Sequence, residues 1–253
     1  MYEFELIIYI FKGQSSTIMQ LYHHPVIQGK TFTMDKNESH HCVRVMRLSA
    51  NDIIYITNGA GKLYKAKITK PDKNACETEI LETTDVPAER DWSMQIAISP
   101  TKSIERFEWF LEKATEIGTD RIIPLLCNNS ERRIIKEERL KKVMIAAMKQ
   151  SLKAWLPEIT PFVSFESLVT KQFDGCKFIA TASEPHENNL GSLYRKGSDI
   201  IILIGPEGDF QKDEIKLAQA NGFIPASLGK SRLRTETAGL VACHTVNLIN
   251  LIH

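Results

Sequence analysis

From residue 94 onward, short apolar runs alternate with longer segments in which apolar residues recur at helical spacing. The run that ends at Ile204 is apolar at almost every position, which is typical of a strand buried on both faces of a parallel sheet. Strands are expected over residues 94–98, 121–126, 177–182 and 199–204, and helices over 104–117, 137–153, 211–221 and 235–251. This alternation predicts an α/β domain whose mostly parallel sheet is covered by helices on both sides.

Local capping signals mark the ends of two of these helices. Ser103 precedes the first helix and Gly118 follows it, as N-cap residues and C-terminal glycines commonly do. Thr235 can cap the last helix, where Glu236 suits the positive end of the helix dipole. Because capping alone would account for Thr235 and Glu236, these two residues do not by themselves indicate a site.

The N-terminal part of the chain has a different pattern, in which strand-like segments are separated by turns. Strands are expected over residues 53–57, 63–69 and 75–81, with turns at 58–61 and 70–74. One short helix is expected from Glu38 to Met46, with Asn37 as its cap. Several short strands joined by turns predict a small β-barrel.

A polar segment that contains Pro87, residues 83–91, indicates a linker between the two parts. We therefore predict an N-terminal domain at 19–88 and a C-terminal domain at 89–253. Met19 opens a more regular pattern than Met1, so residues 1–18 are interpreted as an upstream extension and Met19 as the natural start. The apolar run at 6–11 is too short to span a bilayer, and the absence of a preceding basic segment makes it a poor signal peptide.

The charge balance and the cysteine pattern narrow the function classes. The net charge is only +1, so any contact with nucleic acid must come from a local basic patch. The five cysteines are scattered and form no CxxC pair, which argues against a disulfide framework or a metal site. The pattern favours reduced thiols in a cytoplasmic protein, with no metal and no membrane partner.

Two glycine-containing turns carry the strongest local signal for a ligand. Gly205-Pro206-Glu207-Gly208 follows the buried strand, at the carboxyl edge of the sheet where α/β proteins bind ligands. Leu228-Gly229 precedes Leu233-Arg234-Thr235-Glu236-Thr237-Ala238, which opens the last helix. The chain has neither GxxxxGKS/T nor a GxGxxG after its first strand, so the common phosphate-binding loops are unsupported. A plain strand-to-helix turn is the alternative for the first motif.

The two motifs, in this order and at this spacing, resemble those of the RsmE family, the small-subunit ribosomal RNA uracil-N3 methyltransferases of the SPOUT superfamily. The resemblance spans nearly all of residues 19–253. It includes further residues in both halves of the chain: His40, His41, Val43, Arg44, Arg47, Leu48, Lys102, Lys113, Ala114, Thr115, Glu116, Ile117, Gly118, Pro124, Gln150, Ser151 and Pro157.

The resemblance implies a fold, a cofactor and a substrate. The fold would be a C-terminal SPOUT-type domain with a parallel sheet and a deep trefoil knot, preceded by a PUA-like RNA-binding β-barrel. The protein would be a homodimer that transfers a methyl group from S-adenosyl-L-methionine to N3 of a specific uridine. That uridine would lie near the 3′ end of 16S ribosomal RNA in the small ribosomal subunit.

The resemblance also assigns roles to particular residues. Arg234 could stabilise charge on the uracil oxygens or hold a phosphate, and Glu207 could orient Arg234 or lie near the sulfonium. An ion pair of Arg234 with Glu207 or Glu236 is the structural alternative. Cofactor binding is assigned to Thr181, Ile204, Gly205, Pro206, Gly208, Leu228, Gly229, Leu233, Thr235, Thr237 and Ala238. RNA binding is assigned to His40, His41, Arg44, Arg47, Arg132 and Arg133, the last two opening a basic stretch at 132–153. No residue stands out as the proton acceptor, and His244 is expected to face the core or a dimer interface.

Two departures from the family pattern leave alternatives open. Asp209 stands where the family usually has a second glycine, and its carboxylate could cap the next helix or narrow the cofactor loop. Lys149 and Lys153 stand where the family often has glutamate and arginine, and lysine cannot reproduce bidentate arginine contacts. The alternatives are a catalytically inactive RNA-binding homologue, which Asp209 would favour, a transfer RNA methyltransferase of the same superfamily, and an unrelated metabolic α/β enzyme.

Overall fold

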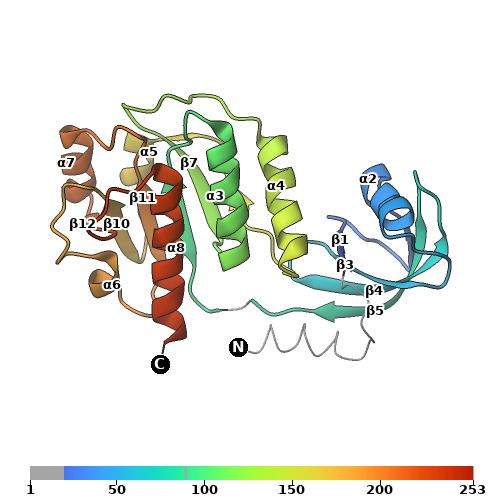
Figure 1. The fold of residues 1–253 in the computed structure, drawn as a ribbon. Coiled ribbons are helices and arrows are strands. Elements are labelled where there is room, and N and C mark those ends of the chain that lie inside the picture. Colours follow the sequence, from blue (N-terminus) through green and yellow to red (C-terminus); the bar gives the residue numbers. More distant parts are fainter. Residues whose placement is uncertain (1–19, 89, 253) are drawn as a thin grey trace. The chain divides into compact units, whose positions relative to one another are not determined.

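The computed structural model describes residues 20–88 and 90–252, whose contacts divide into two compact units (Figure 1). The C-terminal unit holds Arg90–Met144 and the chain from Pro157 onward. The N-terminal unit holds the described residues up to 88 together with Ile145–Leu156. The predicted extension at 1–18 and the predicted start at Met19 lie outside the described residues, and the division at 88/89 stays a prediction.

A parallel sheet forms the centre of the C-terminal unit. Its strand order is β12-β10-β11-β6-β7-β8, and β9 also pairs with β7. All of these pairs are parallel. The strands are β6 (Met94–Ile98), β7 (Arg121–Leu126), β8 (Glu158–Ile159), β9 (Val163–Ser164), β10 (Cys176–Ala180), β11 (Ile200–Ile204) and β12 (Ile224–Ala226). Strand β11 is buried at every residue because it lies between β10 and β6, which explains its unbroken apolar sequence.

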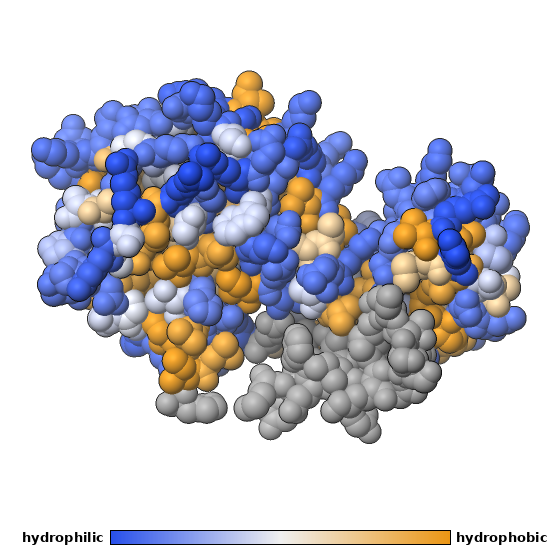
Figure 2. Space-filling model, viewed as in Figure 1, coloured by the Kyte–Doolittle hydropathy of each residue, from blue (hydrophilic) through white to orange (hydrophobic). Residues whose placement is uncertain are grey.

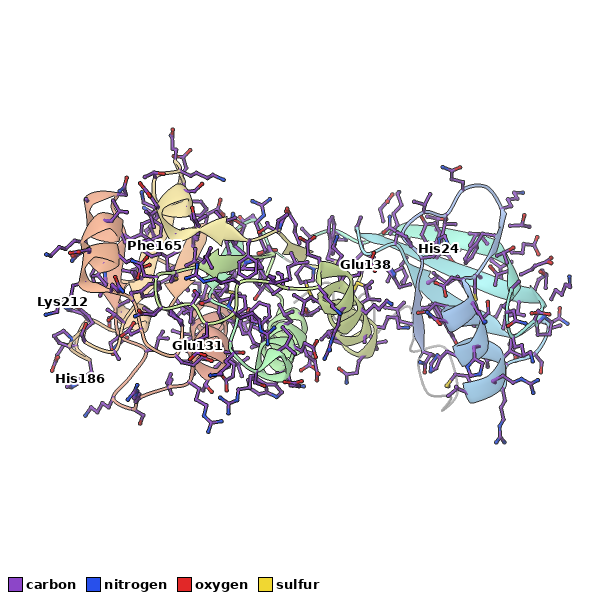
Figure 3. All side chains as sticks on the ribbon, turned by 90° about the horizontal axis from the view of Figure 1, so that it is seen from above. His24, Glu131, Glu138, Phe165, His186 and Lys212 are labelled. Carbon is purple, nitrogen blue, oxygen red and sulfur yellow. The ribbon has the colours of Figure 1, made fainter. Side chains whose placement is uncertain are left out.

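Helices cover both faces of this sheet, which confirms the predicted α/β architecture. On one face, α8 (Thr235–Leu251) lies beside α3 (Ile104–Ile117) and packs on β6 and β11 (Figure 1). On the other face, α5 (Phe165–Val169) and α7 (Lys212–Ala220) join a core cluster with alternate residues of the strands. Phe165, labelled in Figure 3, belongs to this cluster, and its ring centroid lies 5.4 Å from that of Phe210. The remaining helices are α4 (Glu137–Gln150) and the short α6 (Leu190–Leu193). None of the helices described is long and apolar enough to cross a membrane.

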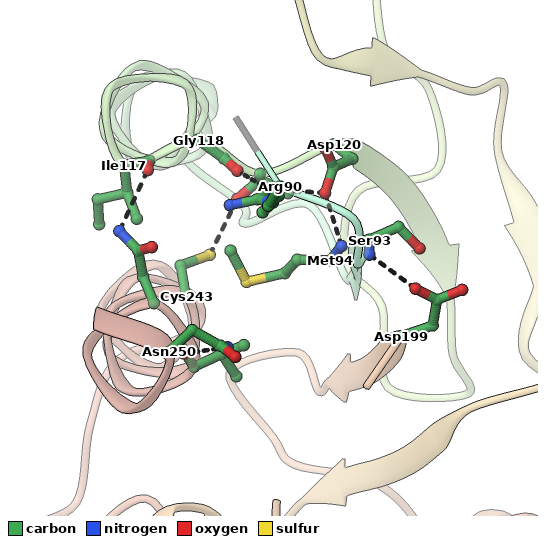
Figure 4. A network of polar contacts seen from close by, with 12 residues as sticks. Arg90, Ser93, Met94, Ile117, Gly118, Asp120, Asp199, Cys243 and Asn250 are labelled. Atoms are coloured by element: carbon green, nitrogen blue, oxygen red, sulfur yellow. Dashed lines mark hydrogen bonds and ion pairs between the residues drawn. The ribbon is translucent and has the colours of Figure 1, made fainter. Parts of the chain in front are cut away.

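A small polar network fixes the start of β6 (Figure 4). The guanidinium of Arg90 donates to the carbonyl of Gly118 and pairs with the carboxylate of Asp120 at 2.6 Å. Asp120 also accepts from the backbone N–H of Met94 at 2.6 Å, and Asp199 accepts from that of Ser93 at 2.8 Å. Charge-assisted hydrogen bonds of this kind are stronger than neutral ones, so they hold the chain in register where it enters the sheet.

The N-terminal unit is a barrel-like five-stranded sheet, as the strand pattern predicts. Its order is β1-β3-β4-β5-β2, in which only β1 and β3 run parallel. The strands are β1 (Leu21–His23), β2 (Thr31–Thr33), β3 (Ile53–Thr57), β4 (Lys62–Lys70) and β5 (Glu77–Asp85). Helix α2 (Lys36–His40) continues into a π-helical turn, η1 (His41–Val45). Tyr22, Cys42 and Ile68 are among the buried residues that fill its core.

Three expectations about element ends are wrong, each for a local reason. Asp35, not Asn37, caps α2, because its carboxylate accepts from the backbone N–H groups of Asn37 and Glu38 at 2.8 and 3.0 Å. Residues 83–85 belong to β5 and not to a linker, because pairing with β4 continues as far as Asp85. Helix α4 ends at Gln150 and not at 153, and Leu152 adopts a left-handed φ of 56°.

Gly239 allows α8 to approach its neighbours closely. A Cβ atom at this position would lie 2.7 Å from Cε2 of Phe110 and 2.9 Å from Cδ1 of Ile98, and both side chains are fully buried. We expect Gly239→Val to lower the free energy of unfolding by about 1–3 kcal/mol through overpacking, measured by urea denaturation. His244 on the same helix is exposed, so the expectation that it could face the core is wrong, and His244→Ala is the control, which should change stability by less than about 0.5 kcal/mol. A Gly239→Val variant as stable as the control would contradict this packing.

Candidate active site

A cavity of about 560 Å³ opens at the carboxyl edge of the parallel sheet. Its walls are the loops that follow β10, β11 and β12 and the first turn of α8. Ten of the residues assigned to a cofactor line it: Thr181, Ile204, Gly205, Pro206, Gly208, Leu228, Gly229, Leu233, Thr235 and Ala238. Glu207 and Arg234 line it as well, whereas Thr237 does not. The two motifs that are far apart in the sequence therefore meet at one cavity.

The cavity is also lined by residues to which the sequence assigned no cofactor-binding or catalytic role: Arg106, Ala180, Ala182, Asp209, Ser227, Ser231, Arg232 and Glu236. Most of them adjoin a motif residue, so a wider window around each motif would have included them. Arg106 is different, because it comes from α3, about a hundred residues before the first motif. Only the packing of α3 beside α8 brings Arg106 to the cavity, and no local pattern marks it.

The two glycines at the centre of the motifs serve different purposes. Gly229 has a φ of +127°, which side chains rarely tolerate, and a Cβ atom there would meet nothing within 4 Å. Gly205 faces the protein, since a Cβ atom there would lie 3.1 Å from the ring of Phe210. The substitution Gly205→Val would therefore collide first with the ring of Phe210.

Asp209 ties two walls of the cavity together. It has a φ of +60°, an uncommon conformation for any residue other than glycine. One carboxylate oxygen accepts from the backbone N–H of Ala182 at 3.3 Å and from the hydroxyl of Thr181 at 3.4 Å. The other accepts from the N–H of Phe210 at 2.8 Å. Asp209 does not cap the next helix, because Gln211 does so through a capping box with Glu214.

Glu207 and Arg132 hold the segment that follows β6. The carboxylate of Glu207 accepts from the backbone N–H of Lys102 at 2.9 Å. Arg132 donates to the carbonyls of Thr101 and Lys102 at 2.9 and 2.5 Å. These contacts give Glu207 a structural partner other than Arg234, and they occupy much of the guanidinium of Arg132, which was predicted to bind RNA.

Arg234 is exposed and is the N-cap residue of α8. Its carbonyl accepts the N–H of Ala238 at 2.7 Å, while its guanidinium makes no hydrogen bond or ion pair with the described residues. The alternative of an ion pair with Glu207 or Glu236 is therefore not observed. Our expectation that Thr235 caps the helix is wrong, because Thr235 is already the first helical residue and is buried.

The residues assigned to RNA binding lie at the surfaces of both units. In the N-terminal unit His40, Arg44 and Arg47 are exposed, whereas His41 is half-buried. Burial, reinforced by the charge of Lys149, lowers the pKa of His41, so this imidazole is less readily protonated than an exposed one. Lys149 forms an ion pair with Glu38 at 2.5 Å within the same unit. In the C-terminal unit Arg133 is exposed, but Arg139 pairs with Glu108, so the basic stretch is partly neutralised.

The cysteines carry no sign of chemistry. All five are free thiols, and four of them are buried. Burial raises the pKa of Cys243 to about 12, so this thiol stays protonated and unreactive. Across the residues that the structure describes, no group of three or more His, Cys, Asp or Glu side chains is arranged to hold a metal ion.

Comparisons with known proteins link this chain to RNA methyltransferases. A family model described as an RNA methyltransferase domain matches residues 88–247, and one described as an RNA methyltransferase PUA domain matches residues 35–81. Ribosomal RNA small subunit methyltransferase E of Synechocystis sp. is 31% identical over 229 residues, which cover 87% of this chain and 73% of that protein.

Two solved structures extend this similarity to the fold. A probable rRNA-methyltransferase from Porphyromonas gingivalis is 39% identical with a TM-score of 0.85, covering 91% of this chain and 99% of that one. A ribosomal RNA small subunit methyltransferase E from Neisseria gonorrhoeae, bound to S-adenosyl methionine, is 27% identical with a TM-score of 0.79. That match covers 91% of this chain and 97% of the other.

Because Asp209 joins two cavity walls from a strained backbone conformation, we expect its alanine and glycine variants to differ in stability. Asp209→Ala removes the hydrogen bonds but keeps a side chain at positive φ, so we expect a loss of about 1–3 kcal/mol in the free energy of unfolding. Asp209→Gly removes the same hydrogen bonds and relieves the backbone, so it should be the more stable of the two by about 1 kcal/mol. Chemical denaturation of both variants measures the difference, and an alanine variant as stable as the glycine variant would contradict the strain argument.

Proposed function

This chain belongs to the RNA methyltransferase family that includes ribosomal RNA small subunit methyltransferase E, and from that premise we propose that it methylates N3 of a uridine in 16S ribosomal RNA. The uridine lies near the 3′ end of that RNA, and S-adenosyl-L-methionine supplies the methyl group. The observation that carries the proposal is the single cavity that both glycine-containing motifs line at the carboxyl edge of the sheet. This is the edge at which open α/β sheets bind their ligands.

The cavity suits S-adenosyl-L-methionine in size and in lining. Its volume of about 560 Å³ is in the range of small-molecule sites. Leu228 and Leu233 offer apolar surface for an adenine ring, and the open space at Gly229 lets a ligand approach the backbone. Ser227 fixes this turn, since its hydroxyl lies 3.2 Å from both the N–H and the carbonyl of Gly229. When bound, the cofactor supplies an electrophilic methyl group on a sulfonium.

The chain's own contribution is to align the two reactants and to stabilise charge. Alignment of two reactants at a rigid site can lower a barrier by roughly 7–11 kcal/mol. The free guanidinium of Arg234 at the cavity can donate to the uracil oxygens as negative charge develops on them. Glu207 acts one step away from the reacting atoms, because it positions the segment at Lys102.

RNA binding is proposed for exposed basic residues of each unit taken separately. Arg44 and Arg47 present their side chains from the N-terminal unit, which is the part of the chain that the PUA domain model matches. Arg133 does so from the C-terminal unit. Arginine is well suited to phosphate because its guanidinium can form two parallel hydrogen bonds.

A homodimer and a trefoil knot complete the proposal. Exposed apolar side chains gather at the end of α8, where Figure 2 shows a hydrophobic patch: Leu248, Leu251 and Ile252. Leu193 of α6 is also exposed. Contiguous exposed apolar residues commonly mark a protein interface. The knot is proposed from the family resemblance, in which the end of the chain is tucked behind an earlier loop.

The proposal is tested by cofactor binding and by mapping of the modified base. Isothermal titration calorimetry with S-adenosyl-L-methionine should give saturable binding at one site per chain. Mass spectrometry of 16S ribosomal RNA from cells that lack the gene should show one unmethylated uridine near the 3′ end, restored by the purified enzyme. Absence of cofactor binding would favour the inactive RNA-binding homologue, and a mark lost from transfer RNA would favour the alternative substrate.

Arg234→Ala is expected to reduce methyl transfer by about 10²–10³-fold, since one charge-stabilising donor is removed. The melting temperature should hardly change, because the guanidinium is exposed and makes no hydrogen bond or ion pair with the described part of the chain. Arg121→Ala, which removes a surface ion pair with Glu158, is the control and should keep full activity. A large drop in the melting temperature of Arg234→Ala would show that this residue is structural.

Arg44→Ala is expected to weaken RNA binding in a way that depends on salt. Each lost phosphate contact should reduce the slope of log affinity against log salt by roughly 0.7–0.9. Lys216→Ala, an exposed lysine on α7, is the control and should leave the slope unchanged. Filter binding over a series of salt concentrations measures the slope for both variants. An unchanged slope for Arg44→Ala would show that Arg44 does not contact an RNA phosphate.

A further inference from the structure

One carboxylate at the cavity has no hydrogen bond. The side chain of Glu236 is only 9% exposed and lines the cavity wall. Its nearest charged partner is Arg106, whose Nε lies 4.0 Å from Oε1, too far for a hydrogen bond. It makes no hydrogen bond and no other ion pair among residues 20–88 and 90–252. Its acceptor positions are unused by the described residues and are open to a donor that enters the cavity.

The fold holds this carboxylate in place. Glu236 is in the first turn of α8, where the positive end of the helix dipole stabilises a negative charge. Thr235 beside it is buried, and Gly239 one turn later presses the helix against Phe110 and Ile98. Glu236 is therefore on a rigid element, whereas Glu207 lies exposed on a loop and already accepts from Lys102.

We infer that Glu236 is the proton acceptor of the reaction, taking the N3 proton of the target uracil. This inference rests on the proposed function and supplies the group that the sequence left unassigned. The N3 position of uracil is an imide N–H, a donor of the kind that the carboxylate lacks. Arg106 and Arg234, at the same cavity, can balance the charge that develops on the uracil oxygens.

The step balances with these groups alone. A carboxylate oxygen of Glu236 takes the N3 proton and becomes a carboxylic acid. The electron pair left on N3 forms the new bond to the methyl carbon, and the electron pair of the breaking carbon–sulfur bond stays on sulfur, which becomes neutral. The proton then passes from Glu236 to water, which restores the carboxylate, and no oxidant or reductant is required.

The primary test compares Glu236→Gln with the wild-type protein and with Asp213→Asn. Asp213 is the matched control, because it is also a first-turn carboxylate but is exposed on α7. The substrate is the small ribosomal subunit from cells that lack the gene. Single-turnover methyl transfer should fall by about 10²–10⁴-fold in Glu236→Gln and stay unchanged in Asp213→Asn. Cofactor affinity, measured by calorimetry, should stay within about threefold in both, since the acceptor acts on the RNA.

A second measurement separates a proton acceptor from a structural residue. Small subunits reconstituted with 5-fluorouridine-containing ribosomal RNA present an N3 proton that is more acidic. The ratio of the methyl-transfer rate on this substrate to the rate on ordinary uridine should be at least about tenfold larger for Glu236→Gln than for the wild type. The reason is that a more acidic N3 proton needs less help from a base. The rate of Glu236→Gln should also rise with pH more steeply than that of the wild type.

The outcomes separate this inference from the proposed function. If the wild type fails to methylate the subunit, the proposed function fails and the inference falls with it. If the wild type is active and Glu236→Gln binds cofactor and keeps its rate, only the inference is overturned. If Glu236→Gln does not fold, Glu236→Asp takes its place. For this variant we expect a smaller loss of methyl-transfer rate and a smaller increase of that rate with 5-fluorouridine. The inference is also overturned if the variant folds, binds cofactor and is slow, but 5-fluorouridine raises its rate by no more than it raises the rate of the wild type.

Discussion

The close packing of α8 against α3 is the constraint on which the site depends. Phe110 and Ile98 leave no room for a Cβ atom at position 239, so a glycine is required for the helix to come this close. That approach carries the first turn of α8 to the loops at the carboxyl ends of β10 and β11. The last helix of the chain therefore completes a cavity whose other walls are the loops after β10, β11 and β12. A side chain at this crossing would move the cavity wall although position 239 is not among the residues that line the cavity.

The cavity walls are held by polar contacts that are local to the C-terminal unit. Asp209 joins the loop after β11 to the loop after β10, and Glu207 joins the same loop to the segment after β6. Ser227 fixes the turn at Gly229 from within. Because each loop is held by a different side chain, the cavity does not depend on a ligand for its shape. Preorganisation of this kind reduces the ordering that binding must bring about.

The sequence predicts the strands and helices best where local and tertiary preferences agree. The predicted bounds of β7 and α8 are those observed, since β7 is apolar almost throughout and α8 begins in the second motif. The cap of α2 was misassigned because Asp35 and Asn37 are both capping residue types, and only the backbone conformation at Asp35 decides between them. Two features depend on contacts between segments that are distant in the sequence. One is the position of Arg106 at the cavity, and the other is the grouping of Ile145–Leu156 with the N-terminal unit. No window of sequence around these residues contains that information.

Two glutamates in the motifs illustrate what burial adds to a sequence pattern. Glu207 lies within one glycine-containing turn and Glu236 follows the other, and residue type alone gives no reason to prefer either as a catalytic group. In the structure Glu207 is exposed and already accepts a backbone N–H, so part of its acceptor capacity is used within the chain. Glu236 is buried beside a guanidinium that is too distant to hydrogen-bond, so its acceptor capacity is unused. The difference in environment, and not in residue type, is what assigns one glutamate to the scaffold and the other to the chemistry.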